Sequence, residues 1–574
     1  MARQTWGARP LDDTRWSFAL WAPDASSVEL ELAGKALSAA PDGDGGWRVE
    51  AAAAADLPYR WMIDGTAYPD PAARAQMSDV HGPSRLVDPR AFTWSCEWPG
   101  RPWHEAVIYE LHVGTFTPEG TFRAMIDQLP RLAELGVTVI ELMPVAQFEG
   151  ARGWGYDGVL PYAPHPAYGT PDDLRALVDA AHGLGLSVLL DVVYNHFGPS
   201  GNYLGAWCPS FFHPERASPW GQGIAFETPA VREFFIENAL HWLDEYRFDG
   251  LRLDAVHAIE DHSSLHFLDE LGQRIRARGY ERPIQLVTED ERNLARYFAP
   301  DAPYDGTWND DWHHAAHCLL TGEDESYYAP FAVDPVGDLA TALADGYVEQ
   351  GQVRKNGDAE GRGEPSGTLP RTAFVNFLSN HDQVGNRARG ERLHHLTDDA
   401  HAYRVVTALT LLAPFPPMLF MGEEFLTEAP FQFFVDFGGD LAEAVRKGRA
   451  QEFARFSSFG GEVPDPVSRS TFEASKIGSP SRSEQQEHQN FIRKLLELRR
   501  KHVIPLLGKD PHPVSKVRRS ESDISARWDF GGGALQIDVR LGSSADPFQP
   551  GSEPFLLLTD EASPFAFSAS VTPE

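Results

Sequence analysis

The sequence predicts an α/β fold in which a TIM (β/α)8 barrel lies between an N-terminal and a C-terminal β-sandwich. Near both ends of the chain, apolar and polar residues alternate, a pattern typical of strands with one buried face. Between these ends, short apolar runs are each followed by a loop and then by a segment of helical period. Such repeats are typical of β-α units, and eight of them close into a barrel.

The first predicted element is a β-sandwich over residues 1–98. Apolar and polar side chains alternate at 28–32 (Val-Glu-Leu-Glu-Leu) and at 59–64 (Tyr-Arg-Trp-Met-Ile-Asp). Turn signals such as Asp42-Gly43 separate these runs.

The barrel is predicted over residues 99–504. Seven apolar runs predict its strands, and a weaker run at 304–308 supplies the eighth. The seven runs are 107–111, 137–142, 186–191, 250–254, 284–289, 373–378 and 418–421. Between them, apolar stripes with helical spacing, such as Phe122, Met125 and Leu129, predict the outer helices.

Two insertions and a terminal unit complete the predicted order. Residues 197–228 are rich in Gly, Pro and aromatic side chains, and we expect a small subdomain there, over the strand ends. Residues 354–370 are expected to form a mobile surface loop. The last barrel helix is expected to begin at Ser481, whose spacing to Glu484 suits a capping box, and the second sandwich to span 505–574.

Composition and charge exclude several classes of partner. The 574 residues include 50 Lys and Arg against 83 Asp and Glu, which gives a net charge of −33. A field of this sign repels phosphates and anionic lipids, so we expect neither a nucleic acid nor a membrane as a partner. No run has signal-peptide or membrane-spanning length, and three scattered cysteines are too few for a disulfide framework. We therefore expect a cytoplasmic protein with a neutral substrate.

Acidic residues fall where the predicted strands end. Asp191 ends the third strand, Asp254 the fourth and Glu289 the fifth, and the seventh runs into Asp382. A single acid at such a place is more often a helix cap or a loop residue. Four of them meet at one face, because the carboxyl ends of barrel strands share one end of the barrel, where active sites lie.

The spacing of Arg252 and Asp254 places both side chains on the same face of a strand, inside the barrel. A guanidinium favours the charged form of a neighbouring acid, so Asp254 is expected to stay ionised, whereas Glu289, among acidic neighbours, is expected to hold a proton. One ionised and one protonated carboxyl group is the pair that glycosidases use. The alternative for Arg252 is a buried ion pair that only fixes the barrel core.

His196 and His381, next to strand-end acids, can donate hydrogen bonds to sugar hydroxyls, and Tyr156 after the second strand is a candidate aromatic platform. The alternative for Tyr156 is packing at the barrel rim. Metal chemistry is disfavoured: His313 and His317 have helical spacing, but the sequence has no His-Glu-x-x-His motif and no clear third ligand. Nucleotide-binding and Ser or Cys nucleophile motifs are also missing, so we expect no cofactor and no metal.

Four short motifs resemble those of the α-amylase superfamily of glycoside hydrolases. They are 191–196 (Asp-Val-Val-Tyr-Asn-His), 250–257 (Gly-Leu-Arg-Leu-Asp-Ala-Val-His), Glu289, and 377–382 (Phe-Leu-Ser-Asn-His-Asp). The resemblance implies that Asp254 is the nucleophile, Glu289 the general acid and base, and Asp382 a third acid that grips sugar hydroxyls. Substrate contacts implied by the matching motifs are Arg252, His196, His381, Tyr156, Asp191, Asn195, His257 and Arg387.

Longer stretches are similar to one subgroup of that superfamily, the maltooligosyltrehalose trehalohydrolases. They include 109–122, 380–388 and 421–425, and the resemblance spans roughly residues 15 to 505. It implies hydrolysis of the α-1,4 bond next to the terminal trehalose of maltooligosyltrehalose, and a maltooligosyltrehalose synthase as pathway partner. One departure follows Asp436, where Phe437-Gly-Gly replaces the usual His and further acids.

Two other functions fit parts of the pattern. A glucan branching or debranching enzyme would use the same acids and a similar first sandwich. A non-catalytic glucan-binding protein is a different class, and it predicts that acids are missing at strand four, five or seven. All three are present.

Overall fold

The computed structural model describes residues 5–218, 221–453 and 463–573. Its centre is a closed barrel of eight parallel strands in chain order, as the sequence predicts, including the weak run at 304–308. The strands are β10 (Ile108–Leu111), β11 (Val139–Leu142), β14 (Ser187–Val192), β17 (Gly250–Leu253), β18 (Gln285–Thr288), β19 (Gly306–Trp308), β20 (Phe374–Phe377) and β21 (Pro417–Phe420). All eight carboxyl ends therefore lie at one end of the barrel.

The barrel strands are short and are buried on both faces. Side chains that point inward, such as Ile108, Val139 and Leu189, form one apolar cluster, and outward-facing residues join the larger core beneath the helices. The longer helices and the short strand pairs of the barrel region are α4 (Pro171–Gly183), α6 (Pro229–Glu245), α7 (Phe267–Ala277), α8 (Asp310–Thr321), α9 (Pro335–Asp345), α12 (Ala400–Leu412), α13 (Gly439–Phe453), α15 (Ser483–Leu498), β12 (Ala146–Gln147), β13 (Leu160–Pro164), β15 (Phe212–Ser218) and β16 (Gly221–Ile224). Shorter helices are α1 (Val113–Phe116), α2 (Phe122–Ile126), α3 (Leu129–Leu135), α5 (Leu204–Trp207), α10 (His381–Gly385), α11 (Leu393–Leu396), α14 (Arg469–Ala474) and α16 (Ile504–Leu507).

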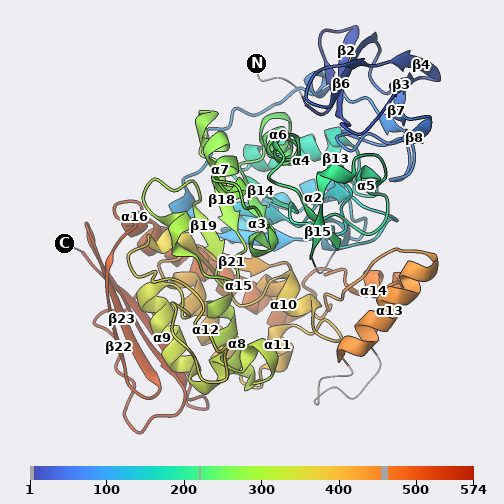
Figure 1. Cartoon of the computed structure of the whole chain (residues 1–574). Coiled ribbons are helices and arrows are strands. Elements are labelled where there is room, and N and C mark those ends of the chain that lie inside the picture. Colours follow the sequence, from blue (N-terminus) through green and yellow to red (C-terminus); the bar gives the residue numbers. More distant parts are fainter. Residues whose placement is uncertain (1–4, 219–220, 454–462, 574) are drawn as a thin grey trace.

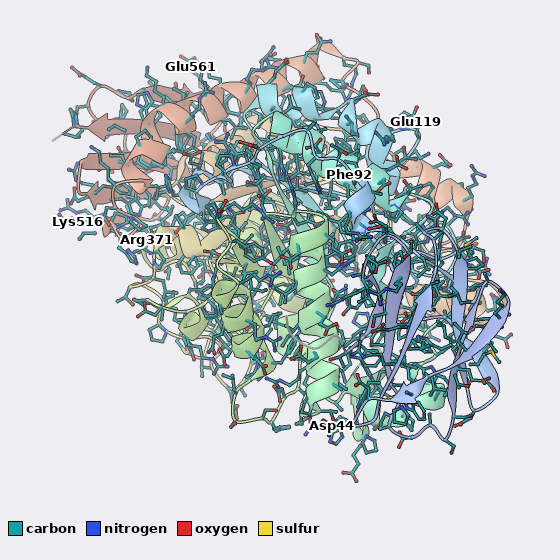
Figure 2. The ribbon with its side chains drawn as sticks, turned by 90° about the horizontal axis from the view of Figure 1, so that it is seen from above. Asp44, Phe92, Glu119, Arg371, Lys516 and Glu561 are labelled. Carbon is teal, nitrogen blue, oxygen red and sulfur yellow. The ribbon has the colours of Figure 1, made fainter. Side chains whose placement is uncertain are left out.

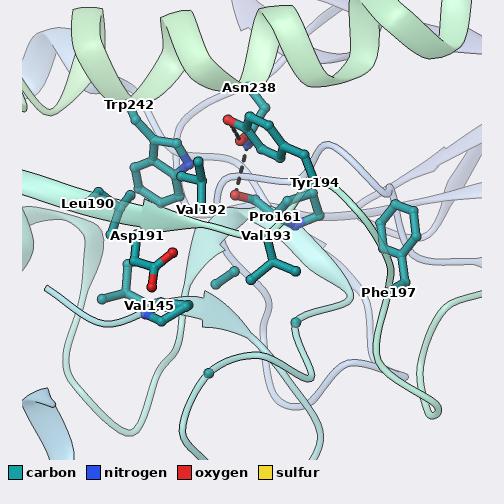
Figure 3. A pocket seen from close by; sticks show the side chains of 14 residues that line it. Val145, Pro161, Leu190, Asp191, Val192, Val193, Tyr194, Phe197, Asn238 and Trp242 are labelled. Carbon is teal, nitrogen blue, oxygen red and sulfur yellow. Dashed lines mark hydrogen bonds between the residues drawn. The ribbon is translucent and has the colours of Figure 1, made fainter. Parts of the chain in front are cut away.

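Helix α6 packs on the outside of β14, and this contact fixes the direction of Asp191. Figure 3 shows Trp242 and Asn238 of α6 on one side of the strand and the carboxyl group of Asp191 on the other. Asn238 donates a hydrogen bond to the carbonyl of Pro161 (2.8 Å) and accepts one from the Tyr194 hydroxyl (2.7 Å). Only a cavity of about 20 Å³ remains between them, so the strand is held firmly.

The N-terminal part consists of two antiparallel sheets (Figure 1). One contains β1 (Gly7–Pro10), β2 (Arg15–Trp21), β6 (Gly46–Ala52) and β5 (Ala40–Pro41), and the other β4 (Lys35–Ser38), β3 (Val28–Leu32), β7 (Pro58–Ile63) and β8 (Thr66–Tyr68), with β9 (Ser84–Arg85) paired to β7. The alternating residues Val28, Leu30 and Leu32 are buried, whereas Glu29 is exposed. This is the pattern expected for one buried face.

The C-terminal strands differ from the expected second sandwich. Within the described chain they form one antiparallel sheet of β22 (Val514–Arg519), β23 (Asp523–Phe530), β24 (Gly533–Leu541), β26 (Phe565–Thr572) and β25 (Leu556–Thr559). Helices α9 and α12 contact this sheet, and the indole of Trp528 donates a hydrogen bond to the carbonyl of Leu343 in α9. Alternation along a strand reveals that one face is buried, but not whether a sheet or a helix buries it.

Figure 2 shows the two terminal β parts on opposite sides of the barrel, with Asp44 on the N-terminal part and Lys516 on the C-terminal sheet. The predicted insertion at 197–228 contains α5 and the strand pair β15 and β16, and its residues 219–220 lie outside the described residues. The segment 354–370 is better anchored than the sequence suggests. Arg362 forms ion pairs with Asp311 and Glu349, and Arg354 with Asp338.

Candidate active site

Four strands bring the predicted acids to the carboxyl end of the barrel. Asp191 lies near the end of β14, Asp254 directly follows β17, and Glu289 directly follows β18. Leu253 and Thr288 are paired in the register of β17 and β18, so the next residues of the two strands are neighbours as well. Adjacent strands lie about 4.8 Å apart, which keeps the two carboxyl groups close together.

Arg252 lies fully buried beneath these acids and contacts three of them. Its Nη1 donates to Asp191 Oδ2 (2.7 Å) and Asp254 Oδ1 (2.9 Å), and its Nη2 forms an ion pair of 2.7 Å with Glu289 Oε2. The guanidinium also stacks over the Trp308 ring, 3.9 Å from the centroid. Arg252 therefore contacts Asp254 and Glu289 alike. Contrary to the expectation from the sequence, Arg252 does not by itself distinguish the two acids.

The two carboxyl groups differ in their other donors. Asn195 Nδ2 donates to the Asp254 carboxylate (2.8 Å), whereas Glu289 Oε2 accepts from the backbone N–H of Ala255 (2.9 Å). Ala255 has a φ of 40°, a left-handed conformation that costs energy for a residue with a Cβ atom. The turn after β17 thus holds a strained backbone that directs an N–H at Glu289.

A second layer supports the acids from β14 and the loop after β11. The Tyr156 hydroxyl donates to Asp191 Oδ2 (2.6 Å), and His196 Nε2 lies 3.0 Å from the Tyr156 carbonyl. Burial raises the pKa of Asp191 to about 7. The charge of Asp254 also raises this pKa, whereas the charge of Arg252 lowers it. Tyr156 thus contacts the acid cluster through its hydroxyl, rather than only packing at the rim.

Helix α10 presents His381 and Asp382 from the end of β20. The Asn380 side chain caps this helix by accepting from the N–H groups of Asp382 (2.9 Å) and Gln383 (3.0 Å). Burial disfavours charge on His381, but the carboxylates of Asp382 and Glu110 outweigh it and raise the pKa of His381 to about 9. Burial also raises the pKa of Asp382. The charge of Glu289 adds to this rise, and the positive charge of His381 opposes it.

The three acids that the resemblance makes catalytic keep part of their surface open. Their side chains are 12 % (Asp254), 18 % (Glu289) and 38 % (Asp382) exposed, whereas that of Arg252 is fully buried. A substrate can therefore reach the carboxylates from the open end of the barrel, while the charge that organises them stays in the core. The arrangement suits a neutral ligand with many hydroxyl groups.

Two of the predicted substrate contacts, His257 and Arg387, form ion pairs with carboxylates outside this cluster. His257 Nε2 lies 3.7 Å from Glu291, and Arg387 forms two hydrogen bonds with Glu323 (2.8 and 2.9 Å). These pairs orient both side chains toward other carboxylates than the three candidate catalytic acids.

Sequence reasoning missed three residues of the site, Trp308, Asp310 and Glu110, and one buried acid beside it, Glu141. Trp308 stacks on Arg252. Asp310 is the first residue of α8, and burial together with the charge of Glu289 raises the pKa of Asp310 to about 7. Glu110 and Glu141 lie in the middle of β10 and β11, both 1 % exposed. The signal for these two was present, because each is a lone acid inside an apolar strand whose both faces must be buried.

Two of the three histidines of α8, His313 and His317, have hydrogen-bond partners within the protein. His313 contacts the Leu378 carbonyl (2.6 Å) and the Tyr328 hydroxyl (2.9 Å), and His317 pairs with Glu323 (2.8 Å). Among the residues that the structure describes, no group of three or more His, Cys, Asp or Glu is arranged to hold a metal ion. In the same part of the chain, no helix has the length and apolar character needed to cross a bilayer.

Comparisons with known proteins agree with this site. The family model "Alpha amylase, catalytic domain" matches residues 68–207. Malto-oligosyltrehalose trehalohydrolase of Deinococcus radiodurans is 44% identical over 505 residues, covering 87% of this chain and 83% of that protein. The same enzyme of Rhizobium sp. (strain M-11) is 38% identical over 569 residues, covering 95% of this chain and 94% of that protein.

A crystal structure of an alpha amylase candidate from Salmonella typhimurium superposes with a TM-score of 0.94 at 47% identity, over 99% of this chain and all of that one. The likeness thus covers the flanking β parts as well as the barrel. The chain belongs to the malto-oligosyltrehalose trehalohydrolases, a family of α-amylase-type glycoside hydrolases.

Proposed function

We propose that the protein hydrolyses the α-1,4-glucosidic bond next to the terminal trehalose of maltooligosyltrehalose and releases trehalose. The observation that carries this proposal is the pair of carboxyl groups, Asp254 and Glu289, at the ends of adjacent strands with Arg252 between them. The family membership supplies the substrate.

In the proposed mechanism, Glu289 protonates the oxygen that leaves with trehalose while Asp254 attacks the anomeric carbon of the adjoining glucose. The C–O bond breaks as the bond to Asp254 forms. Water, deprotonated by Glu289, then opens the glycosyl-enzyme and frees the maltooligosaccharide. Asn195 and Arg252 hold the Asp254 carboxylate in place for the attack, and Asp382 would grip sugar hydroxyls.

Neighbouring strand ends favour two displacements over one. A retaining enzyme needs a carboxyl separation of about 5 to 5.5 Å, and an inverting one needs a wider gap that leaves room for water. Strands about 4.8 Å apart in register support the smaller value for Asp254 and Glu289. We therefore expect the new reducing end to form first as the α-anomer, which proton NMR during early turnover can detect.

The test of the function compares substrates. The purified chain is incubated with maltooligosyltrehalose and, separately, with amylose, and the products are separated by chromatography. We expect free trehalose from the first substrate and little change in the second. New α-1,6 branches in amylose would favour the branching enzyme, and binding without turnover would favour the glucan-binding protein.

Substitutions test the assigned acids. Asp254→Asn and Glu289→Gln should each lower the rate of trehalose release by several orders of magnitude, because each removes a group that reacts in the transition state. Asp290→Asn is a matched control: this carboxylate is next to Glu289 in sequence but pairs with Arg292 (2.7 Å). Near wild-type turnover in either of the first two variants would exclude the assignment.

A maltooligosyltrehalose synthase, which makes the terminal trehalosyl unit, is the partner reaction that this substrate requires. We also propose a cytoplasmic location. The cysteines of the chain, Cys96, Cys208 and Cys318, are free thiols, as expected in a reducing compartment.

A further inference from the structure

His381 lies in a tight aromatic and acidic setting at the base of the site. Its ring is 1 % exposed, stacks on Tyr156 with centroids 4.9 Å apart, and meets the edges or faces of Trp154 (5.5 Å) and Trp308 (5.8 Å). These rings restrict its position but leave the choice between its two ring nitrogens open. A hydrogen-bond partner must decide which nitrogen faces the substrate.

Glu110, in the middle of β10, is that partner. Its Oε2 accepts a hydrogen bond from the backbone N–H of His381 (3.1 Å), and its Oε1 contacts the ring Nδ1. With Nδ1 bound in the barrel core, Nε2 lies on the opposite edge of the ring, 3.4 Å from Asp382 Oδ1. One buried carboxylate thus fixes both the start of α10 and the direction of the imidazole.

A second buried acid lies directly beside Glu110. Glu141 is its register partner on β11, and both carboxyl oxygens of Glu141 are buried with no hydrogen-bond partner among the described residues. Burial raises the pKa of Glu141 well above its usual value, and the charge of Glu110 adds to this effect. Two neighbouring buried carboxyls hold one charge more easily than two, and of this pair it is Glu110 that is hydrogen-bonded to the His381 ring.

We propose that Glu110 is a positioning residue, which holds the His381 ring with its Nε2 edge toward Asp382 and the bound sugar. The inference rests on the proposed function, because it gives His381 a task in that reaction. It goes beyond the motif residues: Glu110 touches no reacting atom and acts through His381. Glu141, equally buried but without a hydrogen bond to the ring, has no such task.

The charge of His381 depends on several elements. The groups that face or influence it are Glu110 on β10, Glu141 on β11, Arg252 on β17, Asp382 on α10, His112 after β10 and the Tyr156 hydroxyl (3.5 Å). Removal of the Glu110 charge leaves Asp382 as the carboxylate nearest the ring, at 3.4 Å. His381 should then lose its proton at a lower pH than in the wild type, because one of the two charges that oppose burial is gone.

The experiment compares Glu110→Gln with the matched variant Glu141→Gln in the full-length enzyme. Glu110→Gln should lower kcat/KM for trehalose release about 10- to 100-fold, mainly through kcat, as expected when a hydrogen bond to a charged group is lost. The ratio of variant to wild-type kcat/KM should fall further as the pH rises from about 6 to about 9. Glu141→Gln should stay within about threefold of the wild type at each pH.

A double-variant cycle shows whether Glu110 acts through His381. His381→Asn combined with Glu110→Gln should lose little more activity than His381→Asn alone. Additive losses would overturn the proposal, and so would equal losses in Glu110→Gln and Glu141→Gln, since those results indicate general damage to the barrel core. If Glu110→Gln does not fold, Glu110→Asp, which keeps the charge but shortens its reach, should fold and retain the wild-type pH dependence at a reduced rate.

The substrate arm separates this inference from the proposed function. If the wild type releases no trehalose but acts on another glucan, Glu110→Gln, Glu141→Gln and the double-variant cycle are compared on that glucan, and only the proposed substrate fails. If the wild type releases trehalose and Glu110→Gln keeps its rate and pH dependence, only the role of Glu110 fails.

Discussion

At the scale of single residues, Glu141 gives a stability prediction with a defined sign. Its folded-state pKa is raised by burial, whereas the unfolded chain titrates normally, so the acid contributes stability at low pH that is lost as the pH rises above about 4.5. Because glutamine does not ionise, Glu141→Gln removes this loss of stability at high pH. The difference in Tm between variant and wild type should therefore grow from pH 5 to pH 8, by about 1 to 3 °C.

Differential scanning fluorimetry across that pH range measures the effect. Asp290→Asn, which removes a buried carboxylate that does have an ion pair, should destabilise the protein at neutral pH instead. A Tm difference for Glu141→Gln that shrinks as the pH rises would show that Glu141 is ionised and paired in the folded state.

Strand-end position was enough to predict that Asp191, Asp254 and Glu289 share one end of the barrel, because parallel strands impose that direction. The sharing of Arg252 was not predictable, since it depends on which strands are neighbours and on the rotamer that reaches across them. Glu110 is hard to identify for a different reason: an acid in an apolar run fits the pattern of a strand, and only the burial of both strand faces makes its charge costly.

At the scale of elements, the segment 351–364 shows how ion pairs order a loop with no regular structure. Asp311 is fully buried at the first turn of α8 and accepts hydrogen bonds from the N–H groups of Val348 and Glu349 (both 2.8 Å). Arg362 neutralises both Asp311 and Glu349. A loop sequence rich in Gly and charged residues predicts that the loop is exposed, but it does not reveal ion pairs such as those of Arg362.

Arg362→Ala should loosen this segment. It leaves the buried carboxylate of Asp311 without its cation and removes one of the two cations of Glu349, which still pairs with Arg354, at a cost of about 1 to 3 kcal/mol. Limited trypsin digestion should then cut faster at Lys355, while the exposed control Glu360→Gln should be cut at the wild-type rate. Unchanged cleavage in Arg362→Ala would mean that the backbone contacts of Asp311 order the segment without Arg362.

Element boundaries followed the local chemistry only in part. The last barrel helix begins at Ser483 rather than Ser481, because the Gln485 side chain accepts from the N–H groups of both Ser481 (2.9 Å) and Arg482 (3.2 Å). The spacing rule found the right kind of cap but the wrong pair of residues. The eight barrel strands were predictable to within about two residues, since each is a buried apolar run with turn residues on both sides.

At the scale of the whole molecule, the N-terminal part contacts one face of α6 and, beside it, the insertion at 197–228. Trp6 packs edge-on against Phe234 (5.1 Å) and Phe211 (6.0 Å), and its indole donates to the Ala230 carbonyl (2.9 Å). Arg74 pairs with Glu245 at the end of the same helix. The sequence indicated separate β and barrel regions, but such contacts between distant segments leave no periodic signal in a single chain.

This seam predicts that the N-terminal sheets and the barrel unfold together in the wild type and separately when the seam is weakened. Trp6 is 2 % exposed and contacts both α6 and Trp21 of β2, so Trp6→Ala should cost about 3 to 5 kcal/mol and weaken the seam. Calorimetry should then show an earlier transition for the N-terminal part and a later one for the barrel. Trehalose release at temperatures well below both transitions should be unchanged, because the strand-end acids belong to the barrel alone.

Trp47→Ala, which removes a half-buried indole inside the N-terminal sheets, should lower stability without splitting the transition. A single transition in Trp6→Ala at the wild-type temperature would mean that Arg74 and the contacts with the insertion couple the two parts without Trp6.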